Sequence, residues 1–375
     1  MAHDPNNVVR VNPEAPEPGV IKRAAEVLEH GGLVAFPTET VYGLGAHALD
    51  AAAVRKIFAA KERPEWDPFI VHVTGIAMAK TLVTHAPPVF DELAKKFWPG
   101  PLTLVVHKAA RVPDEVTARR DTVALRQPRH PVAAALLAEA QLPIAAPSAN
   151  RFGRPSPTCA QHVVEDLGDR VDLILDAGPT PLGVESTVLD LTQSPTAILR
   201  PGGVSREELE AVLGPVTMAK PARSYRLPAT AQWQAGSVAG GCVAQTQNVG
   251  AKGLRGPGMT AKHYAPRATV ELFEGEPSDM ARQMAVRAGA LCLQGRKVGA
   301  IISEEMRDAV GAHAQFVACF GAWGDWDSLA RKLFGALRAF DSQGADVILC
   351  PLPPAEGLAL ALRDRLLRAA GGLSA

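Results

Sequence analysis

Paired cysteines, net charge and long apolar runs are all missing from this chain, and each absence excludes a class of protein. The 5 cysteines among 375 residues never form a CxxC pair, so no zinc knuckle or dithiol site is indicated and reduced thiols are expected. Lys plus Arg and Asp plus Glu both number 39, which argues against a generally basic coat for nucleic acid, although a local basic patch stays open. No apolar run approaches the roughly 18 residues of a membrane-spanning helix, so no membrane association is expected.

Several familiar catalytic signatures are absent as well. The chain has no GxSxG or HExxH motif, and no GxGxxG opens its last third, which leaves a hydrolase elbow, a zinc-peptidase helix and dinucleotide binding unsupported. The stretch GPTPLG at 178–183 starts like a phosphate-binding loop, but Val184 and Glu185 stand where that loop needs Lys and Ser or Thr. Residues 1–12 are polar and lack the apolar core of a signal peptide, so the cytoplasm is the expected location.

The chain length favours two domains, and the first, residues 1–215, is predicted to be an α/β domain. Apolar periodicity and capping residues place its helices at 20–30, at 51–60 after Asp50, at 76–84, 88–97 and 131–140, and at 206–213 after a Ser205 capping box. Apolar runs place its strands at 33–36, 69–73, 102–107, 122–126, 143–146, 173–176 and 186–191. Because strands and helices do not alternate strictly, we expect a mixed, twisted sheet with helices.

The composition changes twice after residue 215. Residues 216–266 are rich in Gly, Ala, Ser, Thr and Gln and are predicted to be a linker, whose end, GPGMTAKHYAP at 256–266, is dense in turn formers and polar side chains. Residues 267–375 alternate predicted strands (270–273, 297–302, 315–320, 345–350) with predicted helices (278–289, 327–340, 356–370). This alternation predicts a smaller Rossmann-like three-layer α/β domain at the C-terminus.

Polar and cationic side chains collect at the ends of predicted elements in the first domain. Lys61 and Arg63 follow a helix, where two cations could bind a triphosphate, Arg through a bidentate fork and Lys as a point charge. The ordinary alternative is a pair of cations that opposes the helix dipole. Further polar residues end or follow strands: Arg126, Ser148, Asn150, Ser186, Thr187 and Arg200. Together they favour one shared pocket for a phosphorylated nucleotide and a polar co-substrate over a set of unrelated polar turns.

A series of motifs in this order resembles a known family. The motifs are PTETVYGLG at 37–45, KxRP at 61–64, PFIVH at 68–72, VALRQP at 123–128, PSAN at 147–150, GVEST at 183–187 and RPG at 200–202. They resemble the YrdC-like fold, and the chain is similar to the threonylcarbamoyl-AMP synthase family. The GPGMTAKHYAP motif and the Rossmann-like tail resemble the long, two-domain form of that family.

The resemblance implies a reaction and a set of site residues. L-Threonine, bicarbonate or CO2, and ATP with Mg2+ would give threonylcarbamoyl-AMP and pyrophosphate, and the product would pass to the machinery that makes threonylcarbamoyladenosine in tRNA. By resemblance, the catalytic residues are Lys61, Arg63, Ser148 and Asn150. The residues implied for ATP are Lys61, Arg63, Asp67, Thr122, Ser148, Ser156, Arg200, His263 and Tyr264. Those implied for threonine are Thr40, His72, Arg126, Ala146 through its backbone, and Ser186.

One residue departs from the family pattern, and one segment is expected to move. Members of the family often have Asn where this chain has Asp67, and a carboxylate there would repel phosphates unless Mg2+ intervenes. The reaction needs no protein nucleophile and would proceed by positioning and charge neutralisation. Because the carbamate and the mixed anhydride are labile in water, the GPGMTAKHYAP segment is the expected lid.

Three other functions fit parts of the sequence. A non-catalytic protein of the same fold could bind double-stranded RNA or tRNA in the same positive cavity, and direct tRNA binding is left open. The YrdC-like module also occurs inside larger carbamoyltransferases, but these carry zinc-finger-like modules for which this chain has no CxxC pairs. A generic carboxylate-activating ligase would need no bicarbonate.

Overall fold

The N-terminal part of the chain is built on one large mixed sheet. The computed structural model describes residues 7–219, 255–256, 258–259 and 263–371. Within these residues, twelve strands share this sheet in the order β1-β9-β2-β3-β8-β4-β7-β6-β10-β11-β12, and β5 pairs with β6. The strands are β1 (Val8–Arg10), β2 (Val34–Pro37), β3 (Tyr42–His47), β4 (Ile70–His72), β5 (Val83–His85), β6 (Leu102–Lys108), β7 (Thr122–Arg126), β8 (Ile144–Ala145), β9 (Leu173–Asp176), β10 (Thr187–Asp190), β11 (Ala197–Arg200) and β12 (Thr217–Met218). Parallel pairs such as β4 with β7 and antiparallel pairs such as β6 with β7 both occur, which confirms the predicted mixed sheet.

Helices cover both faces of this sheet because successive strand residues point to opposite sides. On β2, Ala35 packs into a hydrophobic cluster with residues of α2 and α4, while Val34 and Phe36 pack into a second cluster with α1 and α6. The helices of this part are α1 (Pro18–Glu29), α2 (Ala51–Lys61), α3 (Ile76–Lys80), α4 (Pro88–Phe97), α5 (Asp114–Thr117), α6 (Pro131–Ala140), α7 (Ala160–Asp166) and α8 (Arg206–Leu213), with a 3-10 turn at Gly168–Arg170.

Local capping chemistry explains where two of these helices begin. The side chain of Asp50 accepts hydrogen bonds from the backbone N–H groups of Ala52 and Ala53 and so starts α2. Ser205 and Glu208 form the predicted capping box at the start of α8. The helix runs from Ala51 to Lys61, so it sets the position of the KxRP motif, whose first residue is the last residue of α2.

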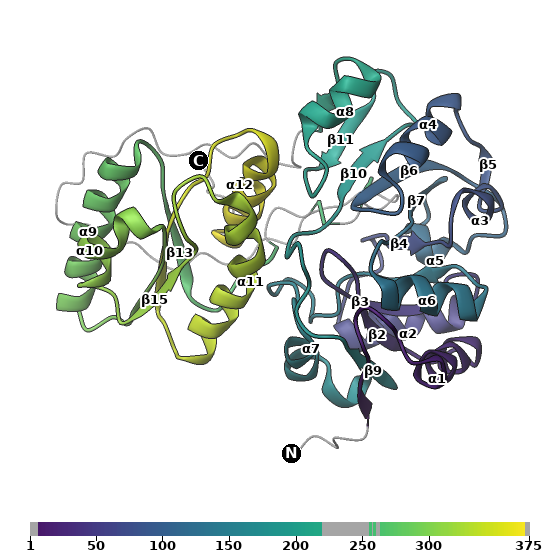
Figure 1. Cartoon of the computed structure of the whole chain (residues 1–375), viewed down its shortest axis with the longest axis horizontal. Helices are drawn as coiled ribbons and strands as arrows, with labels where there is room; N and C mark the ends of the chain where they lie inside the picture. The colour runs from purple at the N-terminus through teal and green to yellow at the C-terminus, as the bar shows by residue number, and fades with distance from the viewer. Residues whose placement is uncertain (1–6, 220–254, 257, 260–262, 372–375) are drawn as a thin grey trace.

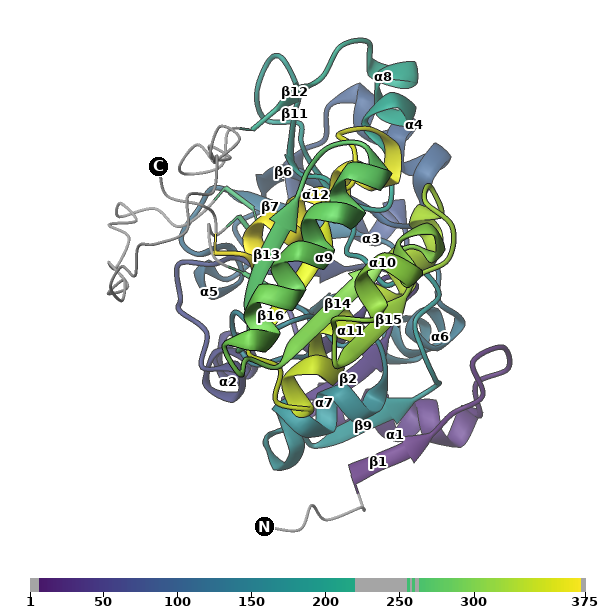
Figure 2. The same ribbon diagram turned by 90° about the vertical axis from the view of Figure 1, so that its left-hand side faces the viewer.

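The C-terminal part is a smaller three-layer α/β domain, as predicted. Its strands lie in the order β13-β16-β14-β15 and every pair is parallel. Its elements are β13 (Thr269–Phe273), α9 (Pro277–Leu293), β14 (Val298–Ile302), a 3-10 turn at Glu304–Met306, α10 (Arg307–Gly311), β15 (Phe316–Cys319), α11 (Trp326–Ser342), β16 (Val347–Pro351) and α12 (Gly357–Ala369). Helices α9 and α10 cover the outer face of this sheet, whereas α11 and α12 lie between the sheet and the N-terminal part (Figures 1 and 2).

The two parts share a packed boundary along α11 and α12. Val41 and Val184 of the N-terminal part belong to the same hydrophobic cluster as the buried residues of these two helices. The backbone at Gly183 runs so close to α11 that a Cβ atom there would lie 2.3 Å from the carbonyl oxygen of Ala330. The C-terminal domain therefore packs against the 183–187 segment of the first domain, which belongs to the pocket described below.

Some sequence predictions need correction. The predicted helix at 76–84 is wrong beyond residue 80, because residues 83–85 form β5 and pair with β6. The predicted loop at 37–45 contains most of β3, which pairs with β2 on one side and β8 on the other. Residues 220–254, which make up most of the predicted linker, and positions 257 and 260–262 of the lid motif lie outside the described residues. The domain boundaries at 215 and 266 stay a prediction.

No helix in the described parts of the chain combines the length and the apolar character that crossing a membrane requires.

Candidate active site

A single pocket gathers most of the polar residues singled out in the sequence. Its lining comes from residues at or just beyond the C-terminal ends of β2, β4, β7 and β8, from the start of β3, from the GVEST segment and from the C-terminal end of β11. The residues that line it are Thr38, Thr40, Val41, Tyr42, Gly43, Arg63, Ile70, His72, Arg126, Ala146, Pro147, Ser148, Glu185, Ser186, Arg200, Gly258, His263 and Tyr264. Three guanidinium groups and several hydroxyls thus face one cavity.

Arg126 forms one end of the pocket and is fixed by two hydrogen bonds and an ion pair. It donates from Nε to the carbonyl oxygen of Gly100 at 3.2 Å and from Nη1 to Oγ1 of Thr40 at 3.1 Å. Its Nη2 lies 2.8 Å from Oε1 of Glu39 in an ion pair in which both side chains are almost fully buried. Burial alone would raise the pKa of Glu39, but the Arg126 charge outweighs burial and the pKa is lowered, so Glu39 stays ionised.

His72 lies beside this arginine at the end of β4. Its ring is buried, and its edge meets Phe36 with ring centroids 6.1 Å apart. Burial and then the nearby Arg126 charge lower the pKa of His72 to about 3. The imidazole is therefore neutral at physiological pH, and it can form hydrogen bonds in the pocket without adding charge.

Arg63 occupies another side of the pocket and is also held by neighbours. Its Nη2 pairs with Oδ2 of Asp67 at 2.8 Å and donates to the carbonyl oxygen of Pro68 at 3.0 Å. The guanidinium lies 5.0 Å from the ring centre of Phe69 and 5.9 Å from that of Phe152. Asp67, the residue that departs from the family pattern, is thus paired with Arg63 within the protein, but its burial outweighs the Arg63 charge and raises the pKa of Asp67.

Lys61 is placed behind the pocket. Its Nζ donates to the carbonyl oxygens of Ser148, at 2.6 Å, and of Asn150. These two hydrogen bonds hold the PSAN turn in place. The amine is fully buried, and burial followed by the Arg63 charge lowers its pKa well below the usual value. Asn150 stabilises the same turn by donating to the carbonyl oxygens of Arg151 and Arg154.

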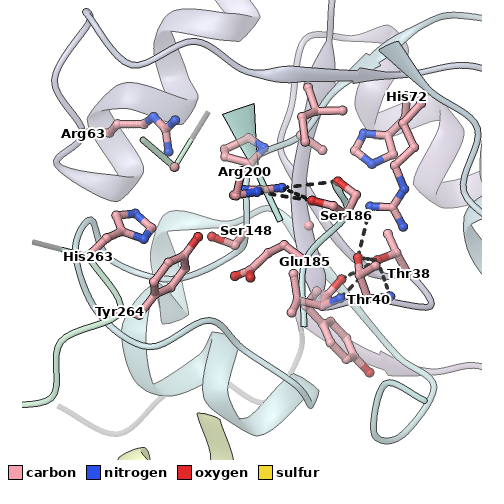
Figure 3. A pocket seen from close by; sticks show the side chains of 18 residues that line it. Thr38, Thr40, Arg63, His72, Ser148, Glu185, Ser186, Arg200, His263 and Tyr264 are labelled. Atoms are coloured by element: carbon pink, nitrogen blue, oxygen red, sulfur yellow. Dashed lines mark hydrogen bonds between the residues drawn. The ribbon is translucent and has the colours of Figure 1, made fainter. Parts of the chain in front are cut away.

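Arg200 and Ser186 form the opposite wall. Arg200 donates from Nη2 to the carbonyl oxygen of Ser186 at 3.0 Å and to its Oγ at 3.3 Å (Figure 3). The Ser186 hydroxyl also shares a hydrogen bond with Oγ1 of Thr103 at 2.8 Å. Gly202 allows this packing, since a Cβ there would lie 2.3 Å from the carbonyl oxygen of Glu185.

His263 and Tyr264, from the end of the lid motif, close the pocket. The two rings meet edge to face, and Tyr264 packs on Phe334 of α11 with ring centroids 5.5 Å apart. The backbone after Tyr264 is also attached to the first domain, because the N–H of Ala265 donates to the carbonyl oxygen of Gly153 at 2.8 Å. Burial lowers the pKa of His263 well below its usual value, helped by the surrounding arginines, so this ring is also neutral.

The structure brings ten predicted site residues into one cavity and places five others outside its lining. Those in the lining are Thr40, Arg63, His72, Arg126, Ala146, Ser148, Ser186, Arg200, His263 and Tyr264. Lys61, Asp67 and Ser156 lie behind the lining and contact it, whereas Asn150 contacts Lys61. Thr122 lines a separate small hollow with Arg120 and Arg255. The roles assigned to all fifteen stay predictions.

Sequence reasoning missed three charged residues that organise the pocket. Glu39 and Glu185 belong to the PTETVYGLG and GVEST motifs, in which only the neighbouring hydroxyl residues were assigned roles. Arg365 lies in the C-terminal domain, far along the chain. Both glutamates are almost fully buried, which for a carboxylate requires a partner, and each pairs with an arginine. The signal that the sequence offers for such a partner is the acidic residue itself, placed inside a motif that otherwise has no charge.

A resident metal site would need a cluster of protein ligands. Within the described residues, no group of three or more His, Cys, Asp or Glu side chains is arranged to hold a metal ion. The carboxylates nearest the pocket, Glu39, Asp67 and Glu185, are each engaged by an arginine.

Known proteins match the chain along nearly its whole length. The family model described as "Telomere recombination" (Sua5_yciO_yrdC) matches residues 26–202, and the model described as "Threonylcarbamoyl-AMP synthase, C-terminal domain" matches residues 204–371. A threonylcarbamoyl-AMP synthase of Pyrococcus abyssi is 42% identical and one of Bacillus subtilis is 40% identical; these alignments cover 94% of this chain and 94% and 93% of the respective relatives.

A solved structure agrees with these relatives. The crystal structure of P. abyssi Sua5 complexed with L-threonine superposes with a TM-score of 0.85 at 39% identity and covers 97% of both chains. The YrdC-like fold, the C-terminal domain and the predicted family are therefore confirmed. The chain belongs to the threonylcarbamoyl-AMP synthase family, in its two-domain Sua5 form.

Proposed function

We propose that this protein synthesises threonylcarbamoyl-AMP and pyrophosphate from L-threonine, bicarbonate or CO2, and ATP. The observation that carries the proposal is the single cavity into which Arg63, Arg126 and Arg200 converge from three different segments. One arginine suits a carboxylate and the other two suit phosphates, because guanidinium groups bind both through paired N–H donors. The product would be handed to the tRNA threonylcarbamoyl-transfer machinery, and we propose the cytoplasm as the place of this reaction.

Threonine fits the end of the cavity formed by Arg126. The guanidinium would bind the amino-acid carboxylate, and Thr40, whose hydroxyl already touches Arg126, would line the same end. Neutral His72 would add a hydrogen bond without repelling the ammonium or amine group. The N–H of Ala146 is used by the carbonyl oxygen of Ile70, so a backbone contact from Ala146 would be made by its carbonyl. A relative crystallised with L-threonine supports the choice of amino acid.

ATP fits the end formed by Arg63 and Arg200, with Ser148 between them. The present cavity measures about 50 Å³, room for about three to five water molecules at most. We therefore propose that His263 and Tyr264 move aside when the nucleotide enters and then close over it, as expected for a lid. Mg2+ would bind with the phosphates and spread their charge.

The chemistry forms an N–C bond and an O–P bond, and it breaks an N–H bond and a P–O bond. The neutral amine of threonine attacks CO2 and forms a carbamate, releasing a proton. A carbamate oxygen then attacks the α-phosphorus of ATP, and the bond between the α-phosphorus and the bridging oxygen breaks to release pyrophosphate. Arg63 and Arg200 would offset the charge that grows on the phosphates, while Lys61 would act by holding the Ser148 turn in place.

The test is pyrophosphate release by the purified full chain, with threonine and bicarbonate each present or omitted. The proposal predicts release only when both are present. Release with threonine alone would identify a simple amino-acid ligase, and the absence of release from folded protein would contradict an ATP-dependent synthase.

A further inference from the structure

An arginine of the C-terminal domain reaches into the pocket wall of the first domain. Arg365 lies on α12 and its side chain is completely buried. Its Nε donates to Oε2 of Glu185 at 2.7 Å, and its Nη2 donates to the carbonyl oxygen of Pro201 at 3.0 Å. The two residues that it contacts flank the segments that carry Ser186 and Arg200.

Glu185 is an unusual residue for a pocket that binds a nucleotide. It lies near the centre of the pocket, with Tyr264 and Ser148 on one side and Ser186 on the other (Figure 3). Its Oε1 accepts a hydrogen bond from the hydroxyl of Ser156 at 2.5 Å. An uncompensated carboxylate at this place would repel a triphosphate, because like charges at short range disfavour each other most strongly where water is excluded.

The charge of Glu185 is compensated from the other domain. Burial would raise the pKa of Glu185, but Arg365 and then Arg200 outweigh burial and the pKa is lowered, so the carboxylate is ionised. We expect Arg200 to interact with the phosphates of ATP as well as with Glu185. Arg365 pairs with Glu185 and forms a second ion pair with Asp364 at 2.6 Å.

We infer that Arg365 is a positioning residue for the ATP site: by pairing with Glu185 it neutralises the pocket carboxylate and holds the Glu185–Ser186 and Pro201 segments in the arrangement that accepts a triphosphate. This inference rests on the proposed function, since it concerns how the same pocket binds ATP. It also gives the C-terminal domain a role in the reaction, as a permanent part of the nucleotide site. Arg365 supports the lid residue Tyr264 as well, since its guanidinium lies 5.1 Å from that ring centre.

A second interdomain ion pair provides a matched control. Arg338 on α11 pairs with Asp166 of α7 at 2.6 Å, and both side chains are buried. Neither residue lines the pocket. Loss of this pair should weaken the contact between the domains about as much as loss of the Arg365 pair, but Arg338 makes no direct contact with Glu185; its other hydrogen bond goes to the carbonyl oxygen of Pro155.

The experiment compares KM for ATP, KM for threonine and kcat, all from pyrophosphate release by the full chain, together with thermal unfolding. The variants are Arg365→Gln, the double variant Arg365→Gln with Glu185→Gln, and the control Arg338→Gln. Gln keeps an N–H donor and much of the side-chain volume but removes the charge. One unpaired charge facing the phosphates at an effective dielectric near 20 should raise KM for ATP about 10- to 100-fold in Arg365→Gln.

The double variant distinguishes the effect of the unpaired Glu185 charge from the loss of the structural contacts that Arg365 makes. Removing both charges should return KM for ATP to within about threefold of the wild type, because the repelling carboxylate is gone. The control variant should keep KM for ATP within about twofold even if its melting temperature falls. An Arg365→Gln KM for ATP that matches the wild type, or a double variant no better than the single one, would overturn the inference.

Two further outcomes keep the test decisive. If Arg365→Gln does not fold, Glu185→Gln alone carries the test: it leaves an extra positive charge in the pocket and should lower KM for ATP, and an increase would overturn the inference. If the wild type itself shows no ATP-dependent turnover, the proposed function fails. If the wild type turns over and only the Arg365 prediction fails, the synthase activity stands and the role of Arg365 does not.

Discussion

Replacing Arg126 by Lys should weaken threonine binding without unfolding the protein. Arg126 donates hydrogen bonds to the carbonyl oxygen of Gly100 and the hydroxyl of Thr40, and its third nitrogen forms an ion pair with the carboxylate of Glu39. Lys keeps the positive charge next to Glu39, but a single ammonium group cannot face these acceptors and also bind a substrate carboxylate in the planar, paired manner of a guanidinium.

The size of the effect follows from the contacts that are lost. A hydrogen bond to a charged group contributes about 1.5–3 kcal/mol, so losing one at the threonine carboxylate should raise KM for threonine about 10- to 150-fold. Arg126→Ala should do more, because it leaves the Glu39 carboxylate buried without its partner, which costs about 3–5 kcal/mol. For a domain of this size, that loss lowers the melting temperature by about 6–20 °C.

The assay is the dependence of pyrophosphate release on threonine at saturating ATP, with thermal unfolding in parallel. Arg129→Lys is the matched control, since the Arg129 side chain is exposed and only its backbone N–H contacts Glu39. The reasoning would be refuted if Arg126→Lys kept KM for threonine within twofold of the wild type, or if it lost affinity for ATP and threonine equally.

Three further predictions concern other parts of the site. Lys61→Ala should lower kcat about a hundredfold or more, because the carbonyl oxygens of Ser148 and Asn150 lose the donor that holds the PSAN turn in place; a kcat within threefold of the wild type would contradict its role. Lowering the pH from 6.5 to 5 should reduce the free energy of unfolding by about 2 kcal/mol through His72. The reason is that the His72 pKa is about 3 in the folded state, so only the unfolded chain takes up the proton as the pH falls below 6.5; urea titrations in which His72→Gln shows the same pH dependence as the wild type would be evidence against this. Gly202→Ala should displace the Glu185 backbone, 2.3 Å from the new methyl group, and lower kcat/KM about a hundredfold, while Gly335→Ala, which has open space around it, should have no effect.

Much of the fold could be predicted from local chemistry. The caps at Asp50 and Ser205 and the period of residues 131–140 are local signals, and the structure confirms all three elements. Strand β3 could not be predicted, because the Gly-Leu-Gly sequence at 43–45 is typical of a turn. In the structure Gly45 faces Phe36 and Ile144 so closely that a Cβ would lie 2.8 Å from each, and this close approach depends on neighbours distant in the sequence.

The pocket could be predicted only in part for the same reason. Polar residues at strand ends indicate a shared site, and ten of those predicted do face one cavity. Which of them face the cavity and which support it depends on partners that no local pattern reveals. Lys61 looked like a phosphate ligand, yet its Nζ binds the carbonyl oxygens of the PSAN turn. Arg365 carried no signal at all, because its partner Glu185 lies 180 residues away.

The central claim is that one pocket joins threonine, CO2 and the AMP part of ATP. The most direct test is to incubate the wild-type chain with ATP labelled at the α-phosphorus, with labelled bicarbonate and with unlabelled threonine, and to separate the products quickly. The account predicts one threonine-dependent product that carries both labels, formed together with an equal amount of pyrophosphate. A nucleotide product that carries the phosphorus label without the carbon label would contradict it.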